Sequence, residues 1–373
     1  MSKLLSQGGF GCVFYPGIKC DGKPNPSKKI VTKIQVNNFN AQNESNIGEI
    51  IETIPNYKVY FLPVVSSCSI DVRKIDKSVI SKCEIISKPS DYIAMDIDYI
   101  STVDFTKVLR KVSSKRLLIL LYQTYSYLLD GLKLLHEKDI VHYDLKLDNL
   151  LFVKSTNQPR IIDFGISIDM SQVTAENWSK HFYVYAPEYY VWCIEINMIN
   201  FLIHENKGEL TEREMKLVVD LTVHNNPIMK AYPDKQEEYK RQAYEFYGQF
   251  IGMKSKDVIE KLITFNKTWD NYSLSVLIFS LLQKLFDKDE DKNSYIFGLE
   301  RLCMRNINPY PERRLNLDES SSKLEDILYE EGSVKSYLTL ADQVIKNKKS
   351  VSIRIKKEQE ELNTSIQKRK VSV

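Results

Sequence analysis

Two short apolar segments between residues 140 and 163 each lead into acidic residues, and this pattern constrains the fold more than any other feature. The first segment precedes "HYDLKLDN", which contains Asp144, Lys146 and Asn149, and the second, "RIID", ends at Asp163. Such apolar segments are typical of short buried strands. The sequence therefore predicts that two carboxylates and one amide lie at the ends of short strands, in one cleft.

These residue types suit the transfer of a phosphoryl group from ATP. The Asp144 carboxylate can accept the proton of the attacking hydroxyl. Asn149 and Asp163 offer the oxygen ligands that Mg²⁺ prefers, with Mn²⁺ as an alternative ion. The Lys146 ammonium can stabilise charge on the transferred group. We therefore expect Asp144 and Lys146 to be catalytic and Asn149 and Asp163 to bind the metal.

Hydrophobic patterning divides the chain into a strand-rich first part and a helical remainder. Segments rich in β-branched and aromatic residues predict strands at 12–15, 29–36, 60–65 and 92–100. A helix is expected at 43–54. Over 116–138, apolar residues recur at spacings of three and four, which predicts a long helix. The predicted fold class is α+β with two lobes, and ligands often bind in the cleft between lobes.

The motifs, taken in order, resemble those of eukaryotic-type serine/threonine protein kinases. "HYDLKLDN" resembles the catalytic loop, "DFG" at 163–165 the metal motif, and "APE" at 186–188 the end of the activation segment. Asp270 resembles the aspartate that anchors the catalytic loop. Arg314 resembles the arginine that pairs with the glutamate of the third motif, here Glu188. The resemblance implies a two-lobed protein kinase fold.

The resemblance also implies a domain organisation. A small β-rich N-lobe would cover residues 1–98, and a larger helical C-lobe would cover 99–316. Residues 317–373 would form a basic tail rich in Ser, Lys and Glu, which is expected to be solvated or weakly helical. The family usually has a short connection before Asp270, so we expect residues 192–264 to be a helical insertion. Protein substrates or partners would dock at this insertion or at the tail.

By the same resemblance, the start of the chain binds ATP. The backbone N–H groups of a glycine-rich loop would approach the phosphates; this loop contains Leu5, Ser6, Gln7, Gly8, Gly9, Phe10, Gly11, Cys12 and Val13. Lys33 would reach the α- and β-phosphates. Glu44 would pair with Lys33, with Glu49 as the alternative. Met95 would guard the adenine pocket, and Asp96 would offer hinge backbone.

Three positions depart from the family pattern. Ser6 replaces the usual first glycine of the loop. Tyr143 replaces an arginine that normally binds a phosphate on the activation segment, so we expect activity without phosphorylation of that segment. Lys146 favours serine or threonine as the acceptor. His181 stands where such kinases tend to carry threonine, which argues against this choice, but serine or threonine remains the predicted acceptor.

One further resemblance and two alternative functions need to be considered. "GGFGCVFYPGIKC" and "IPNYKVYFLPV" resemble segments of serine/threonine kinases encoded by large double-stranded DNA viruses. One alternative is a scaffold that has the kinase fold but no catalytic activity. Another is a small-molecule or lipid kinase, since these share the H-x-D and D-x-G pattern. The "APE" motif, Asp270 and Arg314 argue against that second alternative.

Composition narrows the partners and the location. A net charge of +3 over 101 charged side chains gives no global field that would attract nucleic acid. The longest apolar stretches are too short to span a bilayer. The six cysteines form no C-x-x-C pair, which argues against zinc and predicts free thiols in a reducing, cytoplasmic compartment, in a host cell or virion if the protein is viral. We expect neither a secretory signal nor a regulatory domain before the glycine-rich loop.

Overall fold

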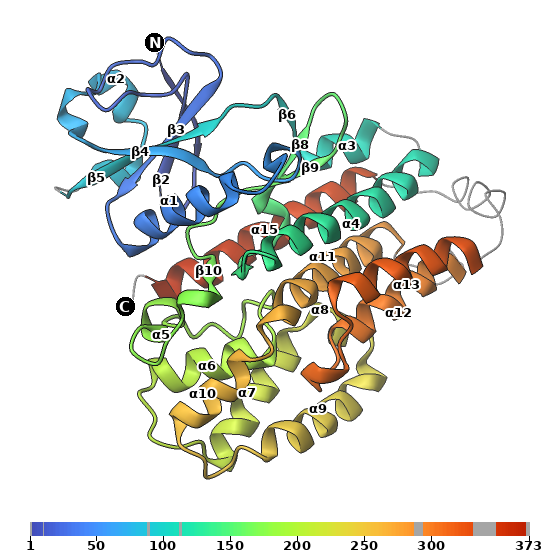
Figure 1. Cartoon of the computed structure of the whole chain (residues 1–373). Coiled ribbons are helices and arrows are strands. Elements are labelled where there is room, and N and C mark those ends of the chain that lie inside the picture. The colour runs from blue at the N-terminus through green and yellow to red at the C-terminus, as the bar shows by residue number, and fades with distance from the viewer. Residues whose placement is uncertain are drawn as a thin grey trace. The chain divides into compact units, whose positions relative to one another are not determined.

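The computed structural model describes residues 2–9, 11–87, 90–111, 114–286, 294–330 and 348–370. The chain divides into two compact units. The N-terminal unit contains residues 1–103 and 149–169, and the C-terminal unit contains residues 104–148 and 170–373 (Figure 1). The first unit is built mainly of strands and the second mainly of helices, which confirms the predicted α+β class.

A five-stranded antiparallel sheet forms the centre of the N-terminal unit, in the order β1-β2-β3-β5-β4 (Figure 1). Its strands are β1 (Lys3–Gln7), β2 (Gly11–Tyr15), β3 (Ile30–Val36), β4 (Val64–Ile70) and β5 (Tyr92–Asp98). Gly11 lets β2 approach β3 closely, because a Cβ at this position would lie 2.6 Å from the Ile34 carbonyl oxygen. The glycine-rich loop is thus the turn between β1 and β2.

A second sheet brings residues 149–169 into the N-terminal unit. It contains β6 (Thr102–Val103), β8 (Leu150–Val153) and β9 (Pro159–Ile161), and β10 (Ile168–Asp169) follows. The Ile161 N–H donates to the Tyr60 carbonyl at 2.8 Å, and the Leu62 N–H donates to the Ile161 carbonyl at 3.0 Å. These bonds explain why the strand expected at 60–65 begins only at Val64. They also explain why 149–169, expected in the C-lobe, group with the first unit.

Helix α1 (Phe39–Glu52) packs on β4, and a glycine sets how closely. The Asn38 side chain caps the helix by accepting a bond from the Ala41 N–H at 3.1 Å. A Cβ on Gly48 would lie 2.2 Å from the Val64 carbonyl oxygen. The glycine therefore permits a backbone contact that turns the helix face containing Glu44 inward. A short helix, α2 (Lys77–Ile80), lies later in the same unit.

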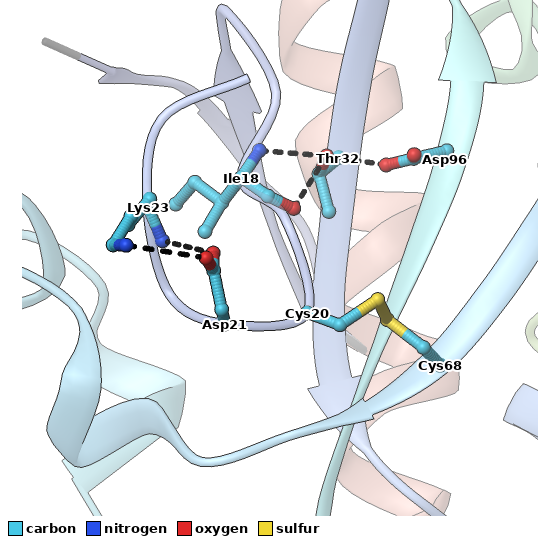
Figure 2. The surroundings of a disulfide bond; sticks show 7 residues. All are labelled: Ile18, Cys20, Asp21, Lys23, Thr32, Cys68 and Asp96. Atoms are coloured by element: carbon cyan, nitrogen blue, oxygen red, sulfur yellow. Dashed lines mark hydrogen bonds and ion pairs between the residues drawn. A yellow bond between two sulfur atoms is a disulfide. The ribbon is translucent and has the colours of Figure 1, made fainter.

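Four cysteines of the N-terminal unit are paired in disulfides, so the prediction of free thiols is wrong for them. Cys12 is bonded to Cys83, and Cys20 to Cys68 (Figure 2). Their Cα atoms lie 6.1 and 6.0 Å apart, within the normal range for disulfides. The partners are 71 and 48 residues apart in sequence, so only the folded sheet brings them together. The argument for a reducing compartment therefore loses its basis.

The loop that follows β2 is held by side-chain hydrogen bonds beside the second disulfide (Figure 2). The Ile18 N–H donates to the Thr32 hydroxyl at 2.8 Å, and that hydroxyl donates to the Asp96 carboxylate at 2.6 Å. Thr32 lies on β3 and Asp96 on β5. These bonds connect the loop after β2 to the middle of the sheet.

The C-terminal unit is largely helical (Figure 1). Its elements are α3 (Phe105–Lys111), α4 (Ser114–His136), β7 (Ile140–Val141), α5 (Trp178–His181), α6 (Ile194–His204), α7 (Glu212–Asn225), α8 (Pro227–Ala231), α9 (Pro233–Gly248), α10 (Ser255–Ile263), α11 (Trp269–Leu285), α12 (Ser294–Asn306), α13 (Leu317–Glu330) and α15 (Lys348–Lys370). The long helix predicted from the periodicity is α4. Across the described residues, every helix is too short or too polar to cross a lipid bilayer.

The predicted insertion, residues 192–264, and the described parts of the predicted tail pack within the C-terminal unit. Residues 192–264 contain α6 to α10, which confirms their helical character, and α6 contacts α7 and α10. The tail was expected to be solvated or weakly helical. Its described parts are helices that pack against the rest of the unit: α13 against α4 and α12, and α15 against α3 and α11. The described parts of the tail therefore belong to the same compact unit.

A fully buried ion pair joins Arg314 to Glu195 rather than to the expected Glu188. The two guanidinium nitrogens of Arg314 lie 2.6 and 2.9 Å from the Glu195 carboxylate oxygens, and both side chains have 0% exposure. The Tyr247 hydroxyl donates to the same carboxylate at 2.8 Å. Glu188 is exposed, whereas the first turn of α6 directs Glu195 into the core. The assignment of Glu188 from the "APE" letters is therefore wrong.

The ion pair predicts different stabilities for two matched variants. Glu195→Gln should lower the free energy of unfolding by about 3–5 kcal/mol, because it leaves the buried guanidinium without its counter-charge. Glu188→Gln, at an exposed position, should change it by less than about 0.5 kcal/mol. Urea unfolding of both full-length variants measures the difference. Equal midpoints for the two would contradict the assignment.

Candidate active site

Lys33 lies at the centre of a buried charge network in the N-terminal unit. Its ammonium is 2.7 Å from a carboxylate oxygen of Glu44 on α1 and 3.0 Å from one of Asp163. Burial by itself would lower the pKa of Lys33, but the two facing carboxylates raise it above its ordinary value. Lys33 is therefore a cation. The alternative partner, Glu49, is exposed on the other side of α1.

The segment that starts at Asp163 is held in an uncommon backbone conformation. Asp163 has φ of 65°, a value that is rare for residues other than glycine. The Asn43 side chain donates to the carbonyls of Ser167 and Gly165, at 2.7 and 3.3 Å. Strained backbone of this kind persists where the surroundings hold it, and it is concentrated at functional sites. Helix α1 therefore holds both Lys33 and the Asp163 segment in place.

Asn149 is placed next to the Asp163 segment by the second sheet. The Ile162 N–H donates to the Asn149 carbonyl at 3.0 Å, and Leu150 is paired with Ile161. Asn149 is buried. A carboxylate and an amide from neighbouring segments form a donor set that fits Mg²⁺, which in such sites takes further oxygens from phosphates and water. In the described residues, no three His, Cys, Asp or Glu side chains converge as a metal site.

The glycine-rich loop is mostly exposed. This holds for Leu5, Ser6, Gln7, Gly8 and Gly9, whereas Val13 is half-buried and Cys12 is buried. The Gly8 N–H donates to the Gly11 carbonyl at 3.0 Å, which closes the turn. The Gln7 side chain accepts a bond from the Glu84 N–H at 3.1 Å. Phe10, which was also predicted to contact ATP, lies outside the described residues.

The two residues predicted around the adenine pocket lie within β5. Met95 is fully buried and directly opposite Lys33 across the β3–β5 pair, so both side chains are on one face of the sheet. Asp96 is paired with Thr32 of β3 and with Ser66 of β4. It therefore lies in the interior of the sheet rather than at a strand end.

In the C-terminal unit, Asp270 fixes the backbone that carries Asp144. Its carboxylate accepts bonds from the N–H groups of His142 and Tyr143, at 2.7 and 3.0 Å. Burial would raise the pKa of Asp270, but the neighbouring His136 side chain and the hydrogen bond from the His142 N–H lower it below its ordinary value. The carboxylate is therefore ionised where it receives these bonds, as the anchoring role assigned from sequence requires.

Tyr143 is held in a conformation that a large side chain seldom adopts. Its φ is 67°. The Trp192 indole donates to the Tyr143 carbonyl at 2.8 Å, and the Tyr143 hydroxyl is hydrogen-bonded to the Asn200 side-chain amide. Burial raises the pKa of Tyr143 well above its ordinary value, so the side chain is neutral. A buried neutral phenol offers no cation for a phosphate. Activity without phosphorylation of the activation segment stays a prediction.

Asp144 and Lys146 are joined with a third residue that the sequence did not identify. The Lys146 ammonium lies 3.1 Å from each Asp144 carboxylate oxygen and 3.0 Å from the Tyr189 hydroxyl. The Tyr189 hydroxyl also donates to Asp144. Burial, together with the Asp144 charge, raises the pKa of Tyr189 well above its ordinary value. Tyr189 therefore keeps its proton and orients the Asp144 carboxylate.

Two functional residues were missed for the same reason. Tyr189 and Glu195 both follow the letters "APE", which were taken as the end of the activation segment. Glu195 makes the ion pair that was assigned to Glu188, and Tyr189 supplies a hydroxyl contact to Asp144 that was not predicted. The apolar segment between them, "YVWCI", could have indicated a buried continuation of the segment.

Residues 66–191 match the protein kinase domain. The match includes Asp144, Lys146, Asn149 and Asp163, and it ends before α6. A serine/threonine-protein kinase of Saccharomyces cerevisiae is 26% identical over 147 residues, which cover 36% of this chain and 22% of that protein. Mitogen-activated protein kinase kinase 8 of Arabidopsis thaliana is 34% identical over 97 residues, which cover 26% and 29%.

A meiosis-specific serine/threonine-protein kinase of S. cerevisiae is 37% identical over 83 residues, which cover 22% of this chain and 15% of that protein. The aligned parts span less than a third of the length of each of these relatives. The domain match and the relatives support a eukaryotic-type protein kinase, and they confirm the predicted fold class.

The Asp270 contacts predict an acid-dependent loss of stability. The folded pKa lies below the unfolded value of about 3.9, so this contribution is complete above that value and is lost as pH falls through the folded pKa. Asp270→Asn should cost about 1–3 kcal/mol at pH 7, because a neutral amide cannot accept both backbone bonds well. Urea midpoints at pH 7, 5 and 3 should show the difference from the wild type shrinking in acid. A difference that is constant with pH would exclude this origin.

Proposed function

We propose that the protein transfers the γ-phosphoryl group of ATP to serine or threonine hydroxyls of protein substrates. The observation that carries the proposal is the buried network in which Lys33 contacts both Glu44 and Asp163. A lysine held as a cation between two carboxylates has a fixed position and can bind phosphate oxygens. The names of the relatives, which are serine/threonine kinases, support the choice of acceptor.

Each residue then has a defined part in the reaction. Lys33 orients the phosphates of ATP, while Glu44 holds Lys33. Asn149 and Asp163 would hold Mg²⁺, which neutralises phosphate charge when bound. Asp144 accepts the proton of the attacking hydroxyl.

Lys146 and Tyr189 are the proposed groups that act beside Asp144, where the acceptor hydroxyl would bind. The Lys146 ammonium stabilises negative charge on the group in transfer, because it lies beside the carboxylate that the acceptor hydroxyl must approach. Tyr189 donates to Asp144 and so fixes its orientation. The loop between β1 and β2 would cover the phosphates through its backbone N–H groups.

Several finer assignments also belong to this proposal. Met95 would border the adenine pocket. Substrates or partners would dock on the helices within 192–264. Tyr143 supports activity without phosphorylation of the activation segment, because its buried phenol replaces a cation there. The similarity of residues 8–20 and 54–64 to viral kinases stays a prediction.

Replacing the proposed groups should abolish transfer to a generic acceptor such as myelin basic protein. Lys33→Met, Asp163→Ala and Asp144→Ala should each reduce kcat by about 10²–10⁴-fold, measured with radiolabelled ATP and Mg²⁺ or Mn²⁺. Lys29→Met is the matched control, because Lys29 is exposed just before β3. If the wild type transfers no more label than the Lys33, Asp163 and Asp144 variants, the scaffold alternative replaces the proposal.

The Tyr189 contacts predict a selective effect on kcat. Tyr189→Phe removes the hydroxyl that orients Asp144 and should lower kcat by about ten- to a hundredfold, with KM for ATP unchanged. Unfolding by urea should be little affected, since the ring and its packing remain. A kcat within twofold of the wild type would show that the hydroxyl has no part in positioning Asp144.

A further inference from the structure

Helix α15 forms polar contacts with two segments that flank the proposed catalytic residues. The side-chain amides of Gln359 and Asn363 donate to the Asp148 carboxylate, the latter at 2.6 Å. The Tyr190 hydroxyl donates to the Glu358 carboxylate at 2.6 Å. Asp148 follows Lys146 by two residues, and Tyr190 follows Tyr189 directly. One turn of a C-terminal helix therefore joins both segments that contact Asp144.

The same helix borders a cavity that Lys146 also lines. This cavity has a volume of about 40 Å³ and lies among the catalytic loop, α11 and α15. From α15, Ile355, Glu358, Gln359 and Leu362 face it. Glu358 is also paired with Lys284 of α11. The helix therefore lies directly beside the catalytic loop and covers it at Lys146.

The apolar anchor of α15 is small for a helix of this length. Of its described side chains, the buried apolar ones are Ile355, Leu362 and Ile366. Ile353, on another face, is 57% exposed. The remaining contacts near the loop are hydrogen bonds and an ion pair, which water and another protein can replace. With so few buried apolar side chains and with polar contacts that can be replaced, α15 could detach from the catalytic loop while the rest of the C-terminal unit stays folded.

A protein acceptor needs the surface that α15 occupies. Its hydroxyl must come within hydrogen-bond distance of Asp144, so the residues around it must lie over the neighbouring groups. Those groups include Asp148 and Tyr190, whose hydrogen-bonding atoms are taken by α15. The helix and a bound acceptor would therefore compete for the same atoms.

We propose that α15 is an intrachain cover that restricts access of protein acceptors to Asp144, and that its release activates the enzyme. This inference rests on the proposed kinase function. The polar contacts of α15 described above are with residues of the C-terminal unit, whereas the Lys33 network belongs to the N-terminal unit. Release should therefore change the use of the acceptor and not the binding of ATP.

Two matched substitutions in the full-length protein test the cover. Ile355→Asp places a carboxylate at a position with 2% exposure and should detach α15, whereas Ile353→Asp changes the exposed position on the same helix. If the covered form exceeds the open form by ten to one, release should raise kcat/KM for myelin basic protein by about tenfold. The increase should come from a lower KM for the acceptor, with KM for ATP unchanged. Ile353→Asp should match the wild type.

Release is measured independently by hydrogen exchange of the backbone at 145–148 and 190–191, which should quicken in Ile355→Asp. The triple variant Glu358→Ala, Gln359→Ala, Asn363→Ala removes only the polar contacts of α15. It provides a second test of release in case Ile355→Asp does not fold. Faster exchange with an unchanged or reduced kcat/KM would overturn the cover while leaving the kinase function in place. Unchanged exchange in both variants would also overturn it, by showing a fixed helix. Faster exchange without transfer in any variant, wild type included, would instead overturn the kinase function.

Discussion

The carboxylate of Asp270 accepts hydrogen bonds from two consecutive backbone N–H groups, and the proposed catalytic loop depends on this contact. It holds Tyr143 at positive φ, and the residue that follows, Asp144, is thereby directed to Lys146 and Tyr189. A bend of this kind is unfavourable for a large side chain, so it persists only because buried partners hold it. Helix α11 supplies Asp270 from the core, which links the geometry of the loop to the packing of the whole C-terminal unit.

Buried charges recur where segments distant in sequence are held in fixed positions relative to one another. Lys33 joins β3 to α1 and to the Asp163 segment. Arg314, which lies just before α13, joins its segment to α6 through Glu195. Buried pairs add little net stability, but removing one partner is costly, so each pair strongly disfavours any arrangement in which it is broken. Both units therefore use a cation enclosed by acceptors to fix the segments that carry functional side chains.

Particular residues show which features could be predicted from the sequence and which could not. Spacing and residue type predict that Asp144, Asn149 and Asp163 form one chemical set, because short strands that end in polar residues are local features. The same reasoning failed for Glu188, because three matching letters do not tell which glutamate turns inward. It also failed for the cysteines, since each disulfide joins a strand to a connecting segment that only the folded unit brings beside it.

The sequence by itself determined the α+β class and the helical nature of 192–264, because these follow from periodicity. The residues of the candidate site are predicted from chemistry at fixed spacing. Only the tertiary structure decided that Tyr189 orients Asp144, that Glu195 binds Arg314 and that α15 covers the catalytic loop. Each of these contacts joins segments that are between 45 and 215 residues apart in the chain. Such contacts depend on how helices pack against one another, and a pattern within one segment contains no information about its distant partner.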